Sequence, residues 1–417
     1  MTARAHSPRH AALLARYHAC MSSEPIYLDH NATTPLLPEV AEAMGACHSA
    51  EFANPASQHA AGRRARRMLE DAREKIGGLL GARITGMSPD RVIFTSGGTE
   101  ANNLALFGLA QSGEDRSSGS GSDRRHAIIS ALEHPSIVAT SEELRRRGWH
   151  IDQLCANVEG VVSVAPLAQL IRPKTQFVSV MLGQNETGVL QPVAEIAAIC
   201  AQHRVLCHTD AAQVVGKLPV DFQSLGVSAL SVAAHKFHGP LGVGALLVRH
   251  GVDLRPQLFG GFQQGGLRPG TESLALALGM CRALELWHTD RDERVTRMQR
   301  LRDHFETEIA RGWPSAVVIG QGAARLPHTS NIAFVGLDRQ ALFMALDQAG
   351  VACSTGSACA SGSSEASPSL VAMGRTRAEI GSALRFSLGV TTSEAEVEEA
   401  ARRILHCCKE LERRKQA

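Results

Sequence analysis

Short apolar runs alternate with longer amphipathic stretches through the middle of the chain. Runs rich in Val, Ile, Leu and Ala, each bounded by polar or Gly-containing segments, predict buried strands at 92–95, 127–130, 177–181, 205–209, 229–232 and 244–248. The segments between these runs are long enough to form helices. This alternation predicts an α/β fold with a mainly parallel sheet that is covered by helices on both faces.

The pattern changes beyond Trp287. The charged stretch 291–311 predicts a helix that links a large domain, 36–286, to a smaller C-terminal domain, 287–417, with strands at 330–334 and 384–387. The Ser- and Gly-rich stretch 111–125 predicts an exposed loop. Residues 1–25 are interpreted as a disordered extension, with Met21 as an alternative start; their basic, acid-poor beginning only faintly resembles an organelle transit peptide.

Composition narrows the class of protein. The 417 residues are 44% hydrophobic, which is enough to bury a large core. Lys and Arg number 43 against 41 Asp and Glu, so no direct nucleic-acid or membrane partner is indicated. No apolar run approaches the roughly 20 residues of a spanning helix. The ten cysteines form no Cys-x-x-Cys pair, which favours reduced thiols in a soluble, cytoplasmic protein.

Two charged residues point to an aldehyde cofactor. Asp210 follows the predicted strand 205–209, and Lys236 follows the next one, in a His-Lys pair before a Gly-Pro turn. A lysine amine can condense with the aldehyde of pyridoxal phosphate, and a carboxylate can keep the pyridine nitrogen protonated so that the ring accepts electrons. Taken singly, Lys236 would be a surface lysine and Asp210 a helix cap. Their places after neighbouring strands favour one shared cleft.

Other motifs occur in a fixed order along the chain, and each is weak evidence by itself. They are Tyr27-Leu28-Asp29-His30-Asn31-Ala32-Thr33-Thr34-Pro35, Thr95-Ser96-Gly97-Gly98-Thr99-Glu100-Ala101-Asn102-Asn103, Glu133-His134, Asn185-Glu186-Thr187-Gly188, Arg268-Pro269-Gly270-Thr271, Gly356-Ser357-Ala358-Cys359 and Arg385-Phe386-Ser387-Leu388-Gly389. Together with Asp210 and Lys236, they resemble the cysteine desulfurases, pyridoxal-phosphate enzymes of the class V aminotransferase group. The resemblance runs from about Ile26 to about Thr391.

The resemblance implies a fold and an assembly. The fold is the type I, aspartate aminotransferase-like pyridoxal-phosphate transferase fold, with a mainly parallel seven-stranded sheet in the large domain and a smaller α/β domain. Segment 26–35 would pack with 287–417 in the small domain. A homodimer with two composite sites is implied, and L-cysteine is the implied substrate.

The resemblance also assigns site residues. The phosphate would lie at the N-terminus of the helix that opens at Gly98, with Thr271 arriving from the other subunit. For His134 the alternative is a helix cap, for Gly98 an ordinary Gly turn, and for Arg385 a structural ion pair. The implied cofactor-binding residues are Gly98, Thr99, His134, Asn185, Asp210, Gln213, His235, Lys236 and Thr271, and the implied substrate-binding residues are Asn31, Asn185 and Arg385.

Segment 351–368 is rich in Gly and Ser around Cys359, a composition that predicts a mobile loop. By resemblance, Lys236 removes the α-proton, His134 moves protons and Cys359 takes the substrate sulfur as a persulfide, leaving alanine. The partner would be a sulfur-acceptor or iron–sulfur scaffold protein. No permanent metal is expected, although Cys359 can transiently ligate an iron–sulfur cluster on that partner. A chance loop cysteine, as Cys353 illustrates, is the alternative.

Two departures from the family pattern matter. Ala233 stands where a phosphate-binding serine is usual, a loss of roughly 1.5–3 kcal/mol that predicts weaker cofactor affinity. Segment 261–266 replaces a usual Gln-Glu-Arg sequence near the dimer-side phosphate contact. A selenocysteine lyase or other β-lyase, an aminotransferase, and an inactive relative that serves as a scaffold are the alternative interpretations.

Overall fold

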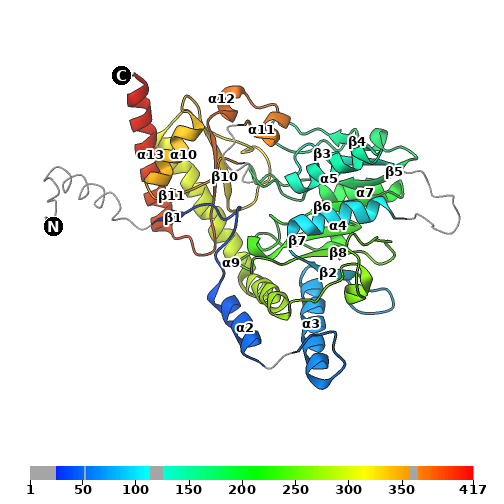
Figure 1. Ribbon diagram of the computed structural model, residues 1–417. Coiled ribbons are helices and arrows are strands. Elements are labelled where there is room, and N and C mark those ends of the chain that lie inside the picture. Colours follow the sequence, from blue (N-terminus) through cyan, green and yellow to red (C-terminus); the bar gives the residue numbers. More distant parts are fainter. Residues whose placement is uncertain (1–24, 51–52, 113–124, 357–364, 417) are drawn as a thin grey trace, which may run out of the picture.

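A computed structural model describes residues 25–50, 53–112, 125–356 and 365–416. Its centre is a seven-stranded sheet in the order β2-β8-β7-β6-β5-β3-β4 (Figure 1). Strand β8 is antiparallel to β2 and β7, and all other pairs are parallel, so the predicted mainly parallel sheet is confirmed. The strands are β2 (Arg91–Thr95), β3 (His126–Ser130), β4 (His150–Leu154), β5 (Thr175–Ser179), β6 (Leu206–Asp210), β7 (Ala229–Ala233) and β8 (Gly244–Val248).

Strand β4 was missed by the sequence pattern. It lies at the edge of the sheet, and only Ile151 and Leu154 among its residues are buried, so its sequence lacks the continuous apolar run of the central strands. The central strands β5 and β7 are buried at every position. An apolar-run criterion therefore finds interior strands and misses this edge strand.

Helices cover both faces of the sheet. On one face, α4 (Gly98–Ala110) and α5 (Pro135–Arg146) pack with Ile129 and Leu246. On the other, α3 (Ala60–Leu79) and α7 (Val193–Gln202) pack with Ile128 and Leu247. Neighbouring strand residues thus point into opposite cores, as the two-residue period of a strand requires. The short helices α6 (Leu167–Leu170), α8 (Phe222–Leu225), η1 (Ala234–Lys236) and η2 (Gln263–Gly266) lie in the connections.

The C-terminal part forms two small sheets. Strands β12 (Ala383–Ser387), β10 (Thr329–Phe334) and β9 (Ala316–Val318) are antiparallel, and β1 (Ile26–Tyr27) pairs in parallel with β11 (Val351–Ala352). Ile26 and Leu28 share a core with Phe305, Leu342 and Ile404. The N-terminal segment therefore packs among C-terminal residues. Four further helices belong to this part: α10 (Arg339–Gln348), α11 (Pro368–Ala372), α12 (Arg377–Ile380) and α13 (Glu394–Gln416).

One long helix, α9 (Leu274–Gly312), joins the two parts (Figure 1). Its first half packs against α2 (Pro38–Ser49) and α3, and its second half against α13. The predicted helix 291–311 is only the second half, and Asp290 interrupts the helical backbone between the halves. The sequence-based boundary near 287 falls within α9, three residues before this interruption. No described helix is long and apolar enough to cross a membrane.

The segment predicted as a Cys-bearing loop is ordered at its beginning. Val351 and Ala352 form β11, and Val351 and Cys353 are buried in the small core. Pairing with β1 supplies the order that the small, polar composition did not suggest. Cys359 and the N-terminal extension 1–24 lie outside the described residues.

Candidate functional site

Three of the predicted site residues meet at the carboxyl ends of the parallel strands. Asp210 is the last residue of β6, Lys236 lies in η1 directly after β7, and His134 follows β3 as the N-cap of α5. Charges on both Asp210 and Lys236 influence the pKa of His134, in agreement with the position of all three at one edge of the sheet. The carboxyl edge of a parallel sheet is the usual place for a ligand site in an α/β protein.

The amine of Lys236 is held by the N-terminal segment. Its Nζ donates hydrogen bonds to the carbonyl oxygens of Asn31 at 2.6 Å and Ala32 at 2.9 Å. The Asn31 carbonyl also accepts a bond of 3.2 Å from the side-chain amide of Gln213. Two residues that the sequence assigned to the cofactor are thus tied to one carbonyl of the segment that follows β1.

The Asp210 carboxylate is buried and fixed from two directions. Its Oδ1 accepts from the backbone N–H of Ala212 at 2.9 Å, and its Oδ2 accepts from the Asn102 amide at 2.7 Å. The same amide donates to Ser136 at 2.9 Å. An ionised carboxylate has about four acceptor positions, so Asp210 keeps capacity for a further N–H donor such as a pyridinium. Asn102 belongs to the motif at 95–103, but the sequence alone did not indicate a role for it.

His134 combines the two interpretations that were open for it. Its Nδ1 accepts the backbone N–H of Ser136 at 3.1 Å, so the ring does cap α5. An accepting Nδ1 places the proton of the neutral ring on Nε2. Burial lowers the pKa of His134, an effect that the Asp210 carboxylate opposes and the Lys236 ammonium reinforces. The ring is therefore a neutral imidazole beside the charged pair.

The N-terminus of α4 is shaped to receive an anion. Among the described residues no side chain caps the helix, and its N-cap residue, Gly97, has φ 153° and open space where a Cβ would stand. Thr99 in the first turn is exposed. The first N–H groups of a helix lack internal partners and carry a positive partial charge. The residues present therefore fit the phosphate of pyridoxal phosphate at this turn.

The departure at Ala233 falls at this same turn. A Cβ added to Gly98 would come within 3.3 Å of the Ala233 Cβ, so a hydroxyl is missing beside the helix N-terminus. Ser231 does not replace it, because its Oγ lies 2.9 Å from His208 Nε2 inside the sheet. His235 lies beside Thr33, with 3.2 Å between Nδ1 and Oγ1. Burial, reinforced by Lys236, lowers the pKa of His235 to about 4, so this ring is neutral.

The second departure, segment 261–266, fastens a loop to the edge of the sheet. The Gln264 side-chain amide accepts the backbone N–H of Phe94 at 2.6 Å and donates to the Phe94 carbonyl at 2.9 Å. A few residues on, Arg268 makes two bonds to Glu100 in the first turn of α4, at 2.7 and 3.2 Å. Thr271 is exposed on the same loop. This connection between the β2 edge and α4 was not visible in the sequence.

The three predicted substrate-binding residues form one cluster. The Asn185 carbonyl accepts from the Asn31 amide at 3.2 Å and from the Arg385 guanidinium at 3.0 Å. Arg385 is buried and pairs with Asp29 at 2.6 Å, while its Nε has no hydrogen-bond partner within the described ranges. The ion pair that was the alternative interpretation of Arg385 is present, and the role in substrate binding remains a prediction.

Both flanks of the segment that contains Cys359 reach this cluster. On one side, Ser354 pairs with the Arg385 backbone, and a Cβ on Gly356 would stand 2.5 Å from Glu186 Oε2. On the other, Ser367 Oγ donates to the same Glu186 oxygen at 2.7 Å. Glu186 is buried, and burial raises its pKa. Sequence reasoning missed Glu186 as the meeting point, because the contact joins residues far apart in the chain.

Cys353 is a poor candidate for the reactive thiol. It is buried in the small core, and burial raises the pKa of its thiol well above the ordinary value. A thiolate is the nucleophilic form of cysteine. The structure thus supports the view that Cys353 packs as an apolar residue.

Lys217 is a further charged residue next to the site that sequence reasoning did not identify. It is fully buried, and its Nζ donates to the backbone carbonyl of Lys236 at 2.6 Å. Burial lowers its pKa to about 7, and the nearby Lys236 charge adds to this effect. The Lys236 segment is therefore held at its amine by Asn31 and at its carbonyl by Lys217.

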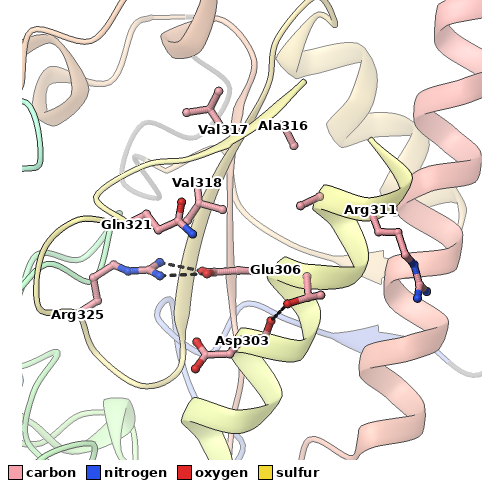
Figure 2. A pocket seen from close by; sticks show the side chains of 10 residues that line it. Asp303, Glu306, Arg311, Ala316, Val317, Val318, Gln321 and Arg325 are labelled. Atoms are coloured by element: carbon pink, nitrogen blue, oxygen red, sulfur yellow. Dashed lines mark hydrogen bonds and ion pairs between the residues drawn. The ribbon is translucent and has the colours of Figure 1, made fainter. Parts of the chain in front are cut away.

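A groove in the small domain is distinct from this site. It lies between α9 and β9, and Figure 2 shows Arg325 and Glu306 turned toward one another, while Arg311 points away from them. Arg325 forms two bonds to Glu306, at 2.8 and 3.0 Å. No lysine lines it. Since its central charges neutralise each other, the groove offers no counterpart of the Asp210 and Lys236 pair.

Comparison with known proteins agrees with this site. The aminotransferase class-V family model matches residues 26–399. The cysteine desulfurase IscS of Dictyoglomus turgidum is 37% identical over 372 residues, 89% of this chain and 91% of the relative. A solved NifS-like protein superposes with a TM-score of 0.84 at 31% identity, covering 93% of this chain and all of the other. A structure described as SspA in complex with cysteine gives 0.73 at 30% identity, covering 88% and 100%.

Pyridoxal 5'-phosphate is the cofactor of this family, in agreement with the Lys236, Asp210 and α4 arrangement. The match spans nearly the whole described chain and includes every residue of the site. The chain belongs to the aminotransferase class-V family and, within it, to the cysteine desulfurases.

Proposed function

We propose that this chain converts L-cysteine to L-alanine and holds the released sulfur as a persulfide on Cys359. The single observation that carries the proposal is the placement of the Asp210, Lys236 and His134 cluster at the carboxyl edge of the sheet. The solved SspA relative in complex with cysteine supports the choice of substrate. Cys359 itself lies outside the described residues, and its flanks contact Glu186 and Arg385.

Bound pyridoxal phosphate supplies an electron sink for the carbon atoms of the amino acid. Asp210, fixed by Asn102 and Ala212, keeps a negative charge where a protonated ring nitrogen needs one. Lys236 supplies the amine that anchors the cofactor and, once released by the substrate, accepts the α-proton. His134 has the Nε2–H tautomer of a neutral ring, which suits it to pass a proton.

Arg385 is proposed to orient the substrate. A guanidinium binds a carboxylate through two parallel hydrogen bonds, and its Nε has no hydrogen-bond partner within the described part of the chain. Asp29 holds one of its other nitrogens at 2.6 Å. The substrate carboxylate would therefore compete with Asp29 for the guanidinium, close to the carbonyl of Asn185.

The sulfur step balances without an added oxidant. The Cys359 thiolate attacks the substrate sulfur, so an S–S bond forms while the C–S bond breaks. The substrate carbon keeps the electron pair of the broken bond and takes up a proton to become the methyl group of alanine. One cysteine and one enzyme thiol thus yield one alanine and one enzyme persulfide, which a sulfur-acceptor or iron–sulfur scaffold protein would consume.

We place the second subunit of a homodimer against the exposed apolar side chains near the Thr271 loop. Phe262 is 95% exposed, Phe259 83% and Leu241 68%. Such side chains on neighbouring loops suit burial against a second copy, which would bring Thr271 to the partner's phosphate site.

The eight cysteines that the structure describes are all free thiols, which suits the reducing cytoplasm.

The test uses the purified protein loaded with pyridoxal phosphate and mixed with L-cysteine. Alanine and protein-bound persulfide are measured in wild type, Cys359→Ser and the matched control Cys155→Ser, which changes an exposed thiol that has no proposed role. Wild type and the control should form both products, and Cys359→Ser should lose the persulfide and most of the alanine. Unchanged alanine formation in Cys359→Ser would instead favour a β-lyase.

A further inference from the structure

A second group of polar side chains lies at the opposite, amino ends of the strands. His126, His150 and Thr175 are the first residues of β3, β4 and β5. Five-residue strands are roughly 15 Å long, so this group is separated from the Lys236 site by the length of the sheet. None of the roles assigned to the catalytic site uses these residues.

Two imidazoles and one carboxylate converge there. His126 and His150 are register partners, and Asp152 stands two residues beyond His150, so all three side chains lie on one face of the sheet. His126 Nε2 is 3.2 Å from Asp152 Oδ2, and His150 Nε2 is 2.9 Å from Asp152 Oδ1. The three ligand atoms lie within 4.8 Å of one another.

This donor set matches a divalent transition metal. Zn²⁺ binds imidazole nitrogen and carboxylate oxygen at about 2.0–2.2 Å, which places tetrahedral ligand atoms about 3.3–3.6 Å apart. The two nitrogen-to-oxygen distances are already close to that separation. His150 is exposed, so rotation of its side chain can bring the two nitrogens together around an ion, with water as a fourth ligand. Two histidines and one carboxylate are also a recurrent set for other divalent ions.

A hydrogen bond from the next strand holds the His126 ring in place. Its Nδ1 lies 2.7 Å from Thr175 Oγ1, which accepts the Arg172 backbone N–H at 2.7 Å. Such an outer hydrogen bond fixes the ring of a metal-binding histidine.

Arg172 is the cation that pairs with Asp152. Its guanidinium lies 2.5 Å from Asp152 Oδ2 and is half exposed. The positive charge satisfies the carboxylate when no metal is bound. Because the side chain reaches into solvent, it can move away when a divalent ion takes the carboxylate.

We propose that His126, His150 and Asp152 form a binding site for a divalent transition-metal ion, for which zinc is the test ion, and that this ion clamps the edge strand β4 to β3. The clamp joins the first residues of the two strands at an open edge of the sheet, where a strand has pairing groups free on one side. The site is structural, and bound metal is not expected to alter the conversion of cysteine.

The test titrates Zn²⁺, and in parallel Co²⁺, into the full-length protein loaded with pyridoxal phosphate. His150→Ala removes an exposed ligand, and His203→Ala is the matched control at an exposed histidine in the turn that follows α7. Wild type and His203→Ala should bind one ion per chain at the site, and His150→Ala should weaken that binding at least about tenfold. Co²⁺ bound by nitrogen and oxygen gives weak visible bands, whereas a cysteine ligand adds strong ultraviolet absorption.

A second variant tests the competition with the guanidinium. Arg172→Ala should tighten Zn²⁺ binding severalfold, because it removes a positive charge from the carboxylate, while cysteine conversion stays unchanged. Equal Zn²⁺ binding by wild type and His150→Ala would overturn the proposal, as would weaker binding by Arg172→Ala. Neither result would bear on the desulfurase proposal, since that is scored by alanine and persulfide.

Discussion

Polar groups lie at both ends of the central strands, and they differ in how fully their hydrogen-bonding capacity is used. At the carboxyl ends, Asp210 is fixed by donors on two sides yet keeps capacity for a further N–H. At the amino ends, His126, His150 and Arg172 all direct their donors at one carboxylate, Asp152. The carboxyl end is thus incomplete without its cofactor, whereas the amino end is already neutral and can exchange a guanidinium for a metal. Parallel strands produce both sites, because they align all like ends at one edge.

The largest effect should come from removing the amine at the carboxyl end. Lys236→Ala is expected to lower alanine formation by about 10³-fold or more, because the amine is both the cofactor anchor and the proposed base. The variant should also lose the visible absorption of covalently bound cofactor. Lys409→Ala, at an exposed position of α13, is the matched control. Substantial alanine formation by Lys236→Ala would contradict the proposal that the catalytic site lies at the carboxyl ends of the strands.

Lys217→Met tests whether Lys217 positions Lys236 at the carboxyl end of the sheet. The change leaves the partly buried Lys236 carbonyl without the Lys217 donor at 2.6 Å, a loss of about 1–3 kcal/mol. We expect at least about a tenfold fall in kcat with little change in cofactor content.

A purely structural role for Lys217 would leave the pH behaviour of the bound cofactor unaltered. The pKa of Lys217 is about 7, lowered first by burial and then by Lys236, so it is charged mainly below pH 7. Removing that charge should raise the pH midpoint of the holoenzyme spectrum on the acid side. An unchanged midpoint, measured by spectral titration beside Lys409→Met, would reduce Lys217 to a packing residue.

Glu133 is a second buried carboxyl group near the site. It tests whether burial keeps such a group neutral there. It is fully buried, accepts from Ser130 at 2.6 Å and from Met181 at 2.8 Å, and burial raises its pKa to about 8. The folded protein therefore holds a proton that the unfolded chain loses above its ordinary value of 4.5. This group then lowers stability as pH rises from about 4.5 to about 8, by about 1.4 kcal/mol per pH unit.

Glu133→Gln should remove that slope. The free energy of unfolding of the variant relative to wild type should increase through the pH window and level off above about pH 8. Buried histidines such as His208, whose pKa burial lowers to about 4, produce the opposite slope below about pH 6.5. They are present in both proteins and cancel in the difference. Denaturation at pH 6, 7 and 8 measures this difference. The same difference in the free energy of unfolding at all three pH values would refute the raised pKa of Glu133.

The sequence predicted the interior of this molecule better than its edges and its long-range contacts. The strand that ends at Asp210 and the strand that precedes Lys236 are short and almost wholly buried, so their ends could be predicted from the local pattern. The bond from Lys236 to Asn31 joins segments far apart in the chain, and no local pattern encodes it. The pairing of His126 with His150 depends on the register of an edge strand that the apolar pattern missed. Periodicity reports burial, whereas register and tertiary contacts are set by the whole fold.

The smallest expected effect comes from restoring a hydroxyl at the phosphate cradle. Ala233 lies beside Gly98 at the uncapped N-terminus of α4. Ala233→Ser would add one donor to the phosphate, and such a bond is worth at most roughly 1.5–3 kcal/mol. Because the helix N–H groups already stabilise the anion, we expect about a three- to tenfold tighter affinity for pyridoxal phosphate, with kcat nearly unchanged. Cofactor titration of the apoprotein measures this, and Ala212→Ser is a control at the other alanine near Gly98, whose Cβ would lie 4.0 Å from a Cβ added there. An equal gain in cofactor affinity in both variants would mean that the added hydroxyl acts on the fold and not on the phosphate. The phosphate site would then not lack a donor at position 233.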